Sequence, residues 1–268
     1  MPTKVSACVI CMNEEANIRA CLESLLFCDE IMLVDSRSTD RTLEIAREAA
    51  GCVPLQVIVR DWPGHIEQKN FAIDQATCDW ILSLDADERV TPELRERIRQ
   101  ILKDDGPADG YSIPRRNIFW GRWVRHGGLY PDYQLRLFRR RAGRFVENAV
   151  HESVTVSGHV EALAEPLLHH SYRDLEDFVR RSNRYSTLSA QDWIRRGKGA
   201  SLLGLVTRPL GRFFSMYIVH RGFLDGWRGF VLAVLYAEYV FLRMAKVWET
   251  RRGRQRGEEP GGSDWKRT

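Results

Sequence analysis

The sequence predicts an α/β fold with a mostly parallel central sheet, followed by a C-terminal helical module. Short apolar runs alternate with helix-patterned segments as far as about residue 105, and this alternation is typical of parallel strands joined by right-handed crossovers. Beyond residue 170, amphipathic and aromatic-rich segments replace the alternation. The chain has 268 residues and a hydrophobic content of 44%, which suits one large domain with an appendage.

Four apolar runs in the first third of the chain have the length and β-branched character of buried strands. They lie at residues 5–12, 31–34, 55–59 and 80–84. Helices are expected between and after them, because apolar residues recur there at helical spacing or follow a capping signal. These helices open at residues 13–17, run through Leu43 and Ala46, cover about 67–76, and begin at Thr91-Pro92-Glu93.

Acidic side chains stand where these strands end. Glu14 and Asp35 follow the first and second strands, and Asp85 and Asp87 follow the fourth. Because the carboxyl ends of parallel strands face one crevice, these carboxylates are expected to converge at a ligand site. Carboxylate oxygens suit Mg²⁺ or Mn²⁺, which usually bind with a substrate phosphate. The alternative is that Asp85 and Asp87 only cap the next helix, but Thr91 already fills that role.

The charge, the motifs and the cysteines of the sequence limit the kinds of ligand and cellular compartment to be expected. The formal net charge is +4 and the pI about 8.8, and without an aromatic-interleaved basic motif the chain is not expected to bind nucleic acid. No glycine-rich phosphate loop is present, so a nucleotide would be held by metal and side chains. The six cysteines lie in the first third of the chain, and reduced, buried thiols in a cytosolic compartment are expected.

The motifs of the chain resemble those of the family 2 glycosyltransferases of the GT-A fold. Over residues 4–105 they are V-S-A-C-V-I-C-M-N-E-E-A-N-I, V-D-S-R-S-T-D-R-T, Q-K-N-F-A-I-D-Q-A and L-S-L-D-A-D-E, which contains a D-x-D motif. Later motifs are similar to those of the lipopolysaccharide-core beta-1,4-glucosyltransferases: Y-P-D-Y-Q-L-R-L-F-R-R, E-N-A-V-H-E and G-F-L-D-G-W-R-G-F. The resemblance implies a hexosyltransferase that uses a UDP-sugar.

The resemblance also implies roles for the acidic residues. Glu14 and Asp35 would hold the uracil and ribose side of the donor. Asp85 would contact the ribose, or the metal through water, and Asp87 would ligate the metal directly. The residues themselves leave two alternatives open, a first-turn helix charge for Glu14 and a strand-end cap for Asp35.

The same resemblance implies roles for two further groups of residues. Lys69 and Asn70 would help to position the nucleotide, although Lys69 can equally be a solvated helix charge. A late histidine, His169 or His170, would contact the metal or the diphosphate, while a structural role is expected for at least one of the two. The metal ligands expected are Asp87, Asp85 and His169.

Inverting transfer needs a carboxylate that takes the proton of the acceptor hydroxyl. The sequence offers Asp132, ahead of an alternating strand at 134–138, and Glu152, beside His151. Asp132 is preferred, because D-Y-Q-L-R-L resembles the segment that carries the proposed base in related membrane-acting transferases. Glu152 stays the second candidate.

Residues beyond about 105 are expected to shape the acceptor site. Aromatic rings there would stack on sugars and arginines would meet acceptor phosphates, with ordinary core packing as the alternative for the tryptophans. The residues concerned are Trp120, Trp123, Tyr130, Arg115, Arg116, Arg122 and Arg125.

Three helical segments are expected in the C-terminal third, at residues 174–195, 202–219 and 226–248. The last is long enough to cross a bilayer, but its charged residues fall within an arc of about 140° at 100° per residue. A single polar face favours lying in the interface of an anionic membrane. The alternative is a helical pair that covers the catalytic domain or forms a dimer.

The sequence therefore predicts a GT-A domain over residues 1–170, with a nucleotide half at about 1–105 and an acceptor half at about 106–170, a helical membrane-surface module over 171–250 and a disordered basic tail over 251–268. The predicted activity is metal-dependent, inverting transfer of a hexose, glucose from UDP-glucose, to a lipid-linked acceptor such as the lipopolysaccharide inner core. The protein would be cytoplasmic and peripheral on the inner face of the bacterial cytoplasmic membrane. The alternatives are another polyprenyl- or lipid-linked saccharide as acceptor, or a catalytically silent nucleotide-binding scaffold of the same fold.

Overall fold

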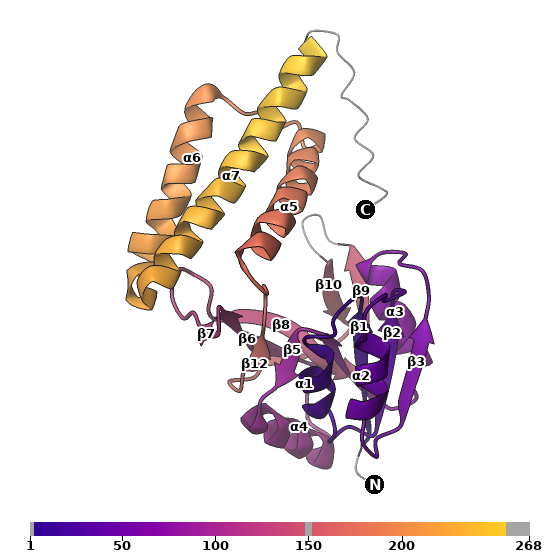
Figure 1. The fold of residues 1–268 in the computed structure, drawn as a ribbon. Coiled ribbons are helices and arrows are strands. Elements are labelled where there is room, and N and C mark those ends of the chain that lie inside the picture. The colour runs from indigo at the N-terminus through magenta and orange to yellow at the C-terminus, as the bar shows by residue number, and fades with distance from the viewer. Residues whose placement is uncertain (1–2, 148–151, 256–268) are drawn as a thin grey trace. The chain divides into compact units, whose positions relative to one another are not determined.

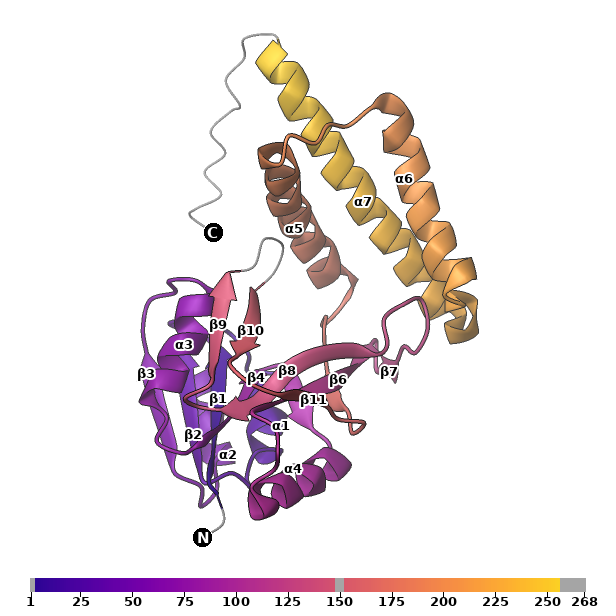
Figure 2. The same ribbon diagram turned by 180° about the vertical axis from the view of Figure 1, so that it is seen from behind.

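The computed structural model of the protein describes residues 3–147 and 152–255, shown from two sides in Figures 1 and 2. The last helix continues through residue 255. The remainder of the tail predicted over 251–268 lies outside the described residues.

The chain divides into two compact units. We call the first the sheet unit, made of Met1–Ile118 and Tyr130–Ser171. The second is the helical unit, made of Phe119–Leu129 and Tyr172–Thr268. The helical unit therefore takes in a short loop from the middle of the sequence as well as the C-terminal third.

Four parallel strands form one half of the main sheet, in the order β3-β2-β1-β4. Their bounds are β1 Val5–Cys11, β2 Glu30–Asp35, β3 Leu55–Val59 and β4 Trp80–Asp85. All the side chains of β1 are buried, as expected for a central strand that is covered on both faces. The four strands predicted from the sequence are thus confirmed in position and direction.

Helices cover both faces of these strands (Figures 1 and 2). Side chains on one face of the sheet pack against α1 Ile18–Glu23, α2 Thr42–Ala49 and α4 Pro92–Asp104. Alternate side chains pack on the opposite face against α3 His65–Gln75. The hydroxyl of Thr91 accepts a hydrogen bond from the backbone N–H of Leu94 at 3.2 Å, so Thr91 is the N-cap of α4, as predicted.

The other half of the sheet is mixed. It continues from β4 in the order β8-β6-β12-β5, and β11 also pairs with β6. β8 is antiparallel to both β4 and β6, whereas β12 is parallel to β6 and antiparallel to β5. The bounds are β5 Glu88–Val90, β6 Gly110–Phe119, β8 Asp132–Arg139, β11 Val160–Ala162 and β12 Leu167–His169.

A separate hairpin packs on the α3 face of the sheet. It consists of β9 Gly143–Glu147 and β10 Glu152–Val156, which pair in antiparallel fashion. Phe145 of β9 is buried in the same cluster as Ala72 and Ile73 of α3. The hairpin therefore closes the second layer of the core.

The helical unit is built from three helices, α5 Leu175–Arg195, α6 Leu202–Phe214 and α7 Gly226–Gln255, with the short strand β7 Arg122–Trp123. A π-helical turn, Ser215–Val219, and a 3-10 turn, Gly222–Asp225, connect α6 to α7. α7 packs against both α5 and α6 (Figure 1). In the described part of the chain, no helix is long and apolar enough to cross a membrane.

The C-terminal motif G-F-L-D-G-W-R-G-F forms the turn into α7. A Cβ added to Gly229 would stand 1.8 Å from the carbonyl oxygen of Gly222, so the backbone approaches too closely there for any side chain. Asp225 accepts hydrogen bonds from the backbone N–H of Arg125 at 3.3 Å and of His126 at 2.7 Å. The motif thus holds the loop of residues 119–129 to the start of the last helix.

Candidate active site

Charged side chains from four strands and one helix meet at the carboxyl end of β4. Lys69 Nζ of α3 lies 2.8 Å from Asp85 Oδ1, and Arg136 Nη2 of β8 lies 2.8 Å from Asp85 Oδ2. The same Arg136 nitrogen lies 2.6 Å from Glu88 Oε1. Both carboxylate oxygens of Asp85 are therefore engaged by cations of the protein.

Glu88 is the buried centre of this network. Its side chain is 0% exposed and pairs with Arg136 and, at 3.3 Å, with Arg115 of β6. Its second oxygen accepts a hydrogen bond from the backbone N–H of Asp85 at 3.0 Å. Glu88 therefore fixes the backbone at the point where Asp85 leaves the sheet, a role that sequence reasoning missed, although the residue directly follows the D-x-D motif.

The ion pairs control the protonation of Asp85. Burial alone would raise its pKa, but the charges of Lys69 and Arg136 outweigh burial and hold the pKa of Asp85 well below its usual range. Asp85 is therefore an anion whose charge is already balanced within the protein. This arrangement fits an organising or ribose-contacting role better than direct metal ligation.

Asp87 and His169 face each other beside the network. His169 Nε2 lies 3.5 Å from Asp87 Oδ2, and both side chains are largely buried. In the sheet, His169 of β12 stands in register with Asn117 of β6 on one side and with Glu88 of β5 on the other. Its Nδ1 lies 2.7 Å from Asn117 Oδ1. Because an amide oxygen only accepts, Nδ1 donates in this contact, and Nε2 is the ring nitrogen that faces Asp87.

These two residues have the features of a partial metal site. Asp87 Oδ1 is buried and has no hydrogen-bond partner among the described residues, which leaves a carboxylate oxygen uncompensated. No group of three His, Cys, Asp or Glu side chains placed to hold an ion occurs in residues 3–147 and 152–255. Asp87 and His169 fit as two ligands of a cation whose other ligands come from a bound substrate or from water.

Asp132 stands at the same edge of the sheet, at the start of β8. It is directly opposite Arg115 in the register of β6 and β8, and Arg115 Nη2 lies 2.6 Å from its Oδ2. Gln134 Nε2 donates to Asp132 Oδ1 at 2.9 Å. Burial acts to raise the pKa of Asp132, but Arg115 and the hydrogen bond from Gln134 lower it overall. Asp132 is therefore ionised at neutral pH.

The structure describes the side chain of Asp132 but not that of Glu152, the second candidate base. Glu152 begins β10, but its side chain and all of His151 lie outside the described residues. The assignment of Asp132 and Glu152 as alternative bases stays a prediction.

Residues expected on the nucleotide side form the loops after β1 and β2. Asp35 is fully buried and accepts a hydrogen bond from the backbone N–H of Ser38 at 2.8 Å. Glu14 Oε2 accepts from Asn17 Nδ2 at 2.8 Å. Asn13 Oδ1 accepts from the backbone N–H of Thr39 at 2.8 Å, so side chains of each loop hold the other. These contacts hold the two loops together, and binding of the nucleotide there stays a prediction.

Lys69 and Asn70 are adjacent on α3, but their side chains contact different parts of the structure. Lys69 is 7% exposed and paired with Asp85, so it is not a solvated helix charge. Asn70 Nδ2 donates to the carbonyl of Phe145 at 2.9 Å, and Asn70 Oδ1 accepts from the N–H of Phe145 at 3.0 Å. Asn70 thus attaches α3 to β9, and a role toward the nucleotide stays a prediction.

The aromatic residues expected at the acceptor site are distributed over both units. Trp120 stacks on Trp227 with ring centroids 5.6 Å apart, and the guanidinium of Arg125 lies 4.1 Å from the Trp123 ring centroid. Both tryptophans belong to the helical unit, whereas Tyr130 belongs to the sheet unit. Stacking of these rings on sugars stays a prediction.

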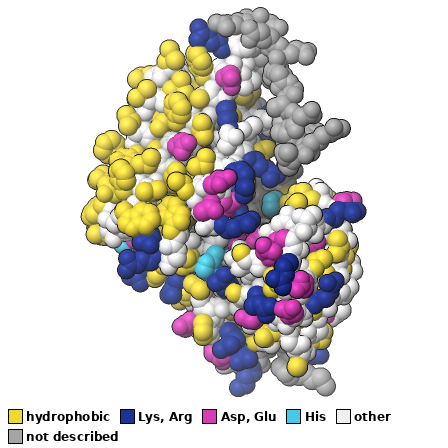
Figure 3. All heavy atoms as spheres, in the orientation of Figure 1, with side chains coloured by type: hydrophobic (Ala, Val, Ile, Leu, Met, Phe, Trp, Pro, Cys, Tyr) yellow, Lys and Arg dark blue, Asp and Glu magenta, His cyan; other side chains and the backbone are white. Residues whose placement is uncertain are grey.

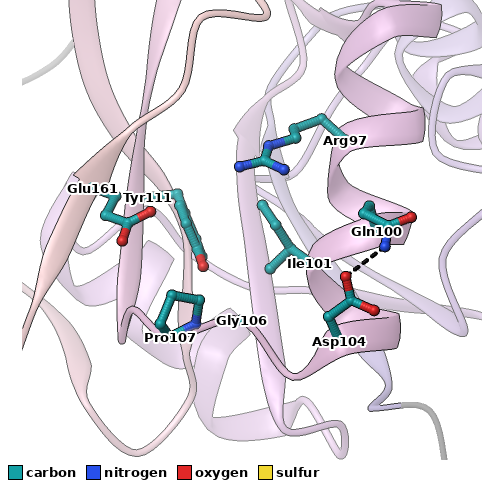
Figure 4. A pocket seen from close by; sticks show the side chains of 8 residues that line it. All are labelled: Arg97, Gln100, Ile101, Asp104, Gly106, Pro107, Tyr111 and Glu161. Atoms are coloured by element: carbon teal, nitrogen blue, oxygen red, sulfur yellow. Dashed lines mark hydrogen bonds between the residues drawn. The ribbon is translucent and has the colours of Figure 1, made fainter.

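A shallow pocket of about 130 Å³ lies elsewhere in the sheet unit, between α4 and β6 (Figure 4). Figure 4 shows Arg97, Gln100 and Asp104 on α4 facing Tyr111 and Glu161 across it. The lining of this pocket includes no residue of the charged cluster around Asp85 and Asp132. The candidate site is therefore the charged cluster and not this pocket.

Comparison with known proteins agrees with this geometry. The family model described as "Glycosyl transferase family 2" matches residues 6–156. The chain is 34% identical over 249 residues to the lipopolysaccharide core biosynthesis glycosyltransferase LpsC of Rhizobium meliloti (strain 1021), covering 91% of this chain and 92% of that protein. It is 31% identical over 259 residues to an uncharacterized glycosyltransferase of Rickettsia felis, covering 92% and 90% of the two chains.

A solved structure shares the fold. The mannosyltransferase PcManGT from Pyrobaculum calidifontis, in complex with GDP-Man and Mn²⁺, superposes with a TM-score of 0.53 at 14% identity, covering 93% of this chain and 88% of that one. The predictions of fold class and of enzyme class are confirmed by these matches and by the mixed, helix-covered sheet.

Proposed function

The chain belongs to glycosyl transferase family 2, and from this premise we propose that it transfers glucose from UDP-glucose to a lipid-linked acceptor, with Mg²⁺ or Mn²⁺ bound. The observation that carries the proposal is the pairing of Asp87 with His169 beside the neutralised Asp85. A buried carboxylate oxygen without a hydrogen-bond partner among the described residues, together with a histidine ring nitrogen that faces the same carboxylate, suits a cation that arrives with a diphosphate.

The metal would be held by Asp87 and His169. When bound, such an ion stabilises the negative charge that develops on the departing diphosphate. Lys69 and Arg136 keep Asp85 ionised, so it can accept hydrogen bonds from donor hydroxyls. Mn²⁺ is bound with GDP-Man in the Pyrobaculum calidifontis enzyme of the same fold, which supports a metal here.

Asp132 is proposed as the base. In an inverting reaction its carboxylate takes the proton of the acceptor hydroxyl, the hydroxyl oxygen bonds to the anomeric carbon, and the bond between that carbon and the diphosphate breaks. Its lowered pKa keeps it unprotonated and able to accept. Arg115 and Gln134 fix the orientation of the carboxylate.

The acceptor class is supported by two observations. The relative LpsC is named for lipopolysaccharide core biosynthesis. In addition, the helical unit carries a surface of solvent-exposed apolar side chains. We call it the apolar face; Figure 3 shows its hydrophobic side chains gathered over α6 and α7. Its exposed members are Leu202, Leu203, Val206, Leu210, Phe214, Trp227, Phe230, Val234 and Phe241. Such a surface suits insertion into the cytoplasmic leaflet of the cytoplasmic membrane, where a lipid-linked saccharide would be reached.

The decisive experiment is calorimetric titration of UDP into the purified protein, with Mn²⁺ and with EDTA. We expect binding that requires the metal and is lost in Asp87→Ala and in His169→Ala. Asp74→Ala is the matched control, because Asp74 is an exposed carboxylate paired with Arg144 on the outer side of α3. Absence of UDP binding in every condition would point to another nucleotide donor or to a silent scaffold.

A second assay addresses the substrates. A panel of UDP-sugars is incubated with lipid-linked lipopolysaccharide core acceptors, and release of UDP is measured together with the sugar gained by the acceptor. We expect UDP-glucose to be the best donor. UDP binding without transfer to any acceptor would contradict the proposed acceptor class and leave the donor site intact.

A further inference from the structure

Three cationic side chains of the helical unit surround one tryptophan. Lys198 Nζ lies 5.0 Å from the Trp193 ring centroid, and the guanidinium carbons of Arg208 and Arg243 lie 5.1 Å and 4.7 Å from it. Lys198 lies in the connection after α5, whereas Arg208 belongs to α6 and Arg243 to α7. A fourth cation, Arg212, lies with its guanidinium 5.4 Å from the Tyr236 ring, and its charge acts on Arg243.

No carboxylate neutralises this cluster in the part of the chain that the structure describes. The ion pairs there include none for Arg208, Arg212 or Arg243. Arg243 is half-buried, and its Nε is buried without a hydrogen-bond acceptor. Burial is the main cause that lowers the pKa of Arg243; Tyr239 acts in the opposite direction, and the charges of Arg208 and Arg212 lower the pKa further. Among the described residues, Arg208, Arg212 and Arg243 thus have aromatic rings, and no carboxylate, against their positive charges.

Aromatic rings offset such a charge only in part, since their attraction for a cation is weak compared with that of an anion. Guanidinium groups present planar forks of N–H donors that match the oxygens of a phosphate in pairs. A doubly charged phosphate would relieve the repulsion among the arginines and supply the acceptor that Arg243 Nε lacks. The cluster is therefore built for an anion with several oxygens.

The cluster is separate from the apolar face. Along α6 the exposed apolar residues Leu202, Val206 and Leu210 follow one another at intervals of four. Arg208 is two positions from Leu210, which places the two about 160° apart around the helix. A ligand of the arginines is thus not simply the bilayer that the apolar face would enter.

We propose that Arg208, Arg212 and Arg243, backed by Trp193, form a binding site for a phosphate group. The group is either the headgroup of an anionic lipid or part of a soluble phosphate ester. The site lies outside the transferase chemistry and requires neither Asp87 nor a metal.

The first test measures binding of inorganic phosphate to the full-length protein by calorimetry in EDTA, so that no metal-loaded donor site contributes. Chloride at equal ionic strength is the reference. We expect Arg243→Gln to weaken phosphate binding about tenfold, as for loss of one charged hydrogen-bonding partner. The matched control is Arg184→Gln, which removes the same charge from an exposed position on α5. Arg208→Gln with Arg212→Gln should weaken binding further.

The second test identifies the source of the phosphate. The same variants are titrated with phosphatidylcholine vesicles that contain phosphatidic acid. Weaker vesicle binding by Arg243→Gln than by Arg184→Gln assigns the site to a lipid headgroup, whereas equal vesicle binding with weakened phosphate binding assigns it to a soluble ester. If Arg243→Gln and Arg184→Gln behave alike in both tests, the site does not exist. UDP binding in Mn²⁺ is unaffected by these substitutions, so failure here is distinguishable from failure of the proposed function.

Discussion

Two clusters of arginines, one in each unit, differ in how their positive charge is balanced. In the sheet unit, Arg115 and Arg136 are largely buried and each pairs with two carboxylates. In the helical unit, Arg208, Arg212 and Arg243 pack on aromatic rings and pair with no carboxylate among the described residues. The cluster in the sheet unit therefore balances its charges internally, while the cluster in the helical unit leaves a positive surplus.

This difference indicates what each region is prepared to do. A network whose charges are already balanced holds its side chains in fixed positions, which is what a reaction centre requires. An unbalanced cluster is stabilised only when an anion arrives, which is what a binding site requires. Substitutions in the balanced network should therefore lower the free energy of unfolding, whereas substitutions in the unbalanced cluster should leave it nearly unchanged.

The largest effect is expected from Asp132→Asn, which keeps the shape of the side chain and removes its ability to take a proton. Turnover should fall about 10²- to 10⁴-fold, the usual contribution of a general base, while UDP binding in Mn²⁺ is retained. Steady-state kinetics with UDP-glucose and a lipid-linked acceptor measures this. Glu152→Gln is the comparison, and near-normal turnover of Asp132→Asn would transfer the role to Glu152.

Arg136→Ala tests the balanced network directly. The substitution leaves Arg115, at 3.3 Å, as the one cation paired with the fully buried Glu88 among the described residues, and leaves one oxygen of Asp85 without its cation. We expect the free energy of unfolding to fall by about 3–5 kcal/mol, as for a buried pair broken on one side. Urea denaturation measures the loss. Arg136→Met combined with Glu88→Gln should be less damaging, and an equal loss would show that the charges do not set the cost.

The same network predicts the response to acid. Asp85 and Asp132 have pKa values below their usual range, so their contribution to stability is complete above the unfolded pKa of about 3.9 and is lost as the pH falls through the lower folded values. Stability from these groups should therefore be flat from pH 7 to about 5 and decline below about pH 4. Denaturation curves recorded across this range should show a shallower acid decline in Asp132→Asn than in the wild type.

The sequence was sufficient for the parallel half of the fold. The apolar runs, the cap at Thr91 and the acidic residues at the ends of strands are local signals, and the structure places them as expected. The predicted start of the first helix was less precise, because a turn occupies residues 15–17 and α1 starts only at Ile18. Turns and first helical residues share the same polar composition, so the boundary is weakly encoded.

Local sequence patterns could not predict which charged residues pair with one another in the site. Arg136 meets Asp85 across 51 residues of sequence, and Arg115 meets Asp132 across 17. Both contacts depend on β8 lying between β4 and β6, which no periodicity specifies. A charged residue inside the apolar alternation of β8 was the available signal for Arg136, since a charge in a strand core requires a partner. The same reasoning finds Glu88, the one acidic residue of a short buried strand.

The smallest effect, and the sharpest test of the contrast, is expected within the helical unit itself. Arg181 of α5 pairs with the largely buried Asp177 at 3.1 Å, so Arg181→Gln should lower the free energy of unfolding by about 0.5–1 kcal/mol after allowing for solvent screening. Arg243→Gln removes a guanidinium that only repels its charged neighbours, and stability should stay within about 0.5 kcal/mol of the wild type or rise. Urea denaturation of both variants in chloride measures the difference. A loss in Arg243→Gln equal to that in Arg181→Gln would mean that the rings around Arg243 stabilise it as well as a carboxylate does, and that the helical unit has no uncompensated charge to offer an anion.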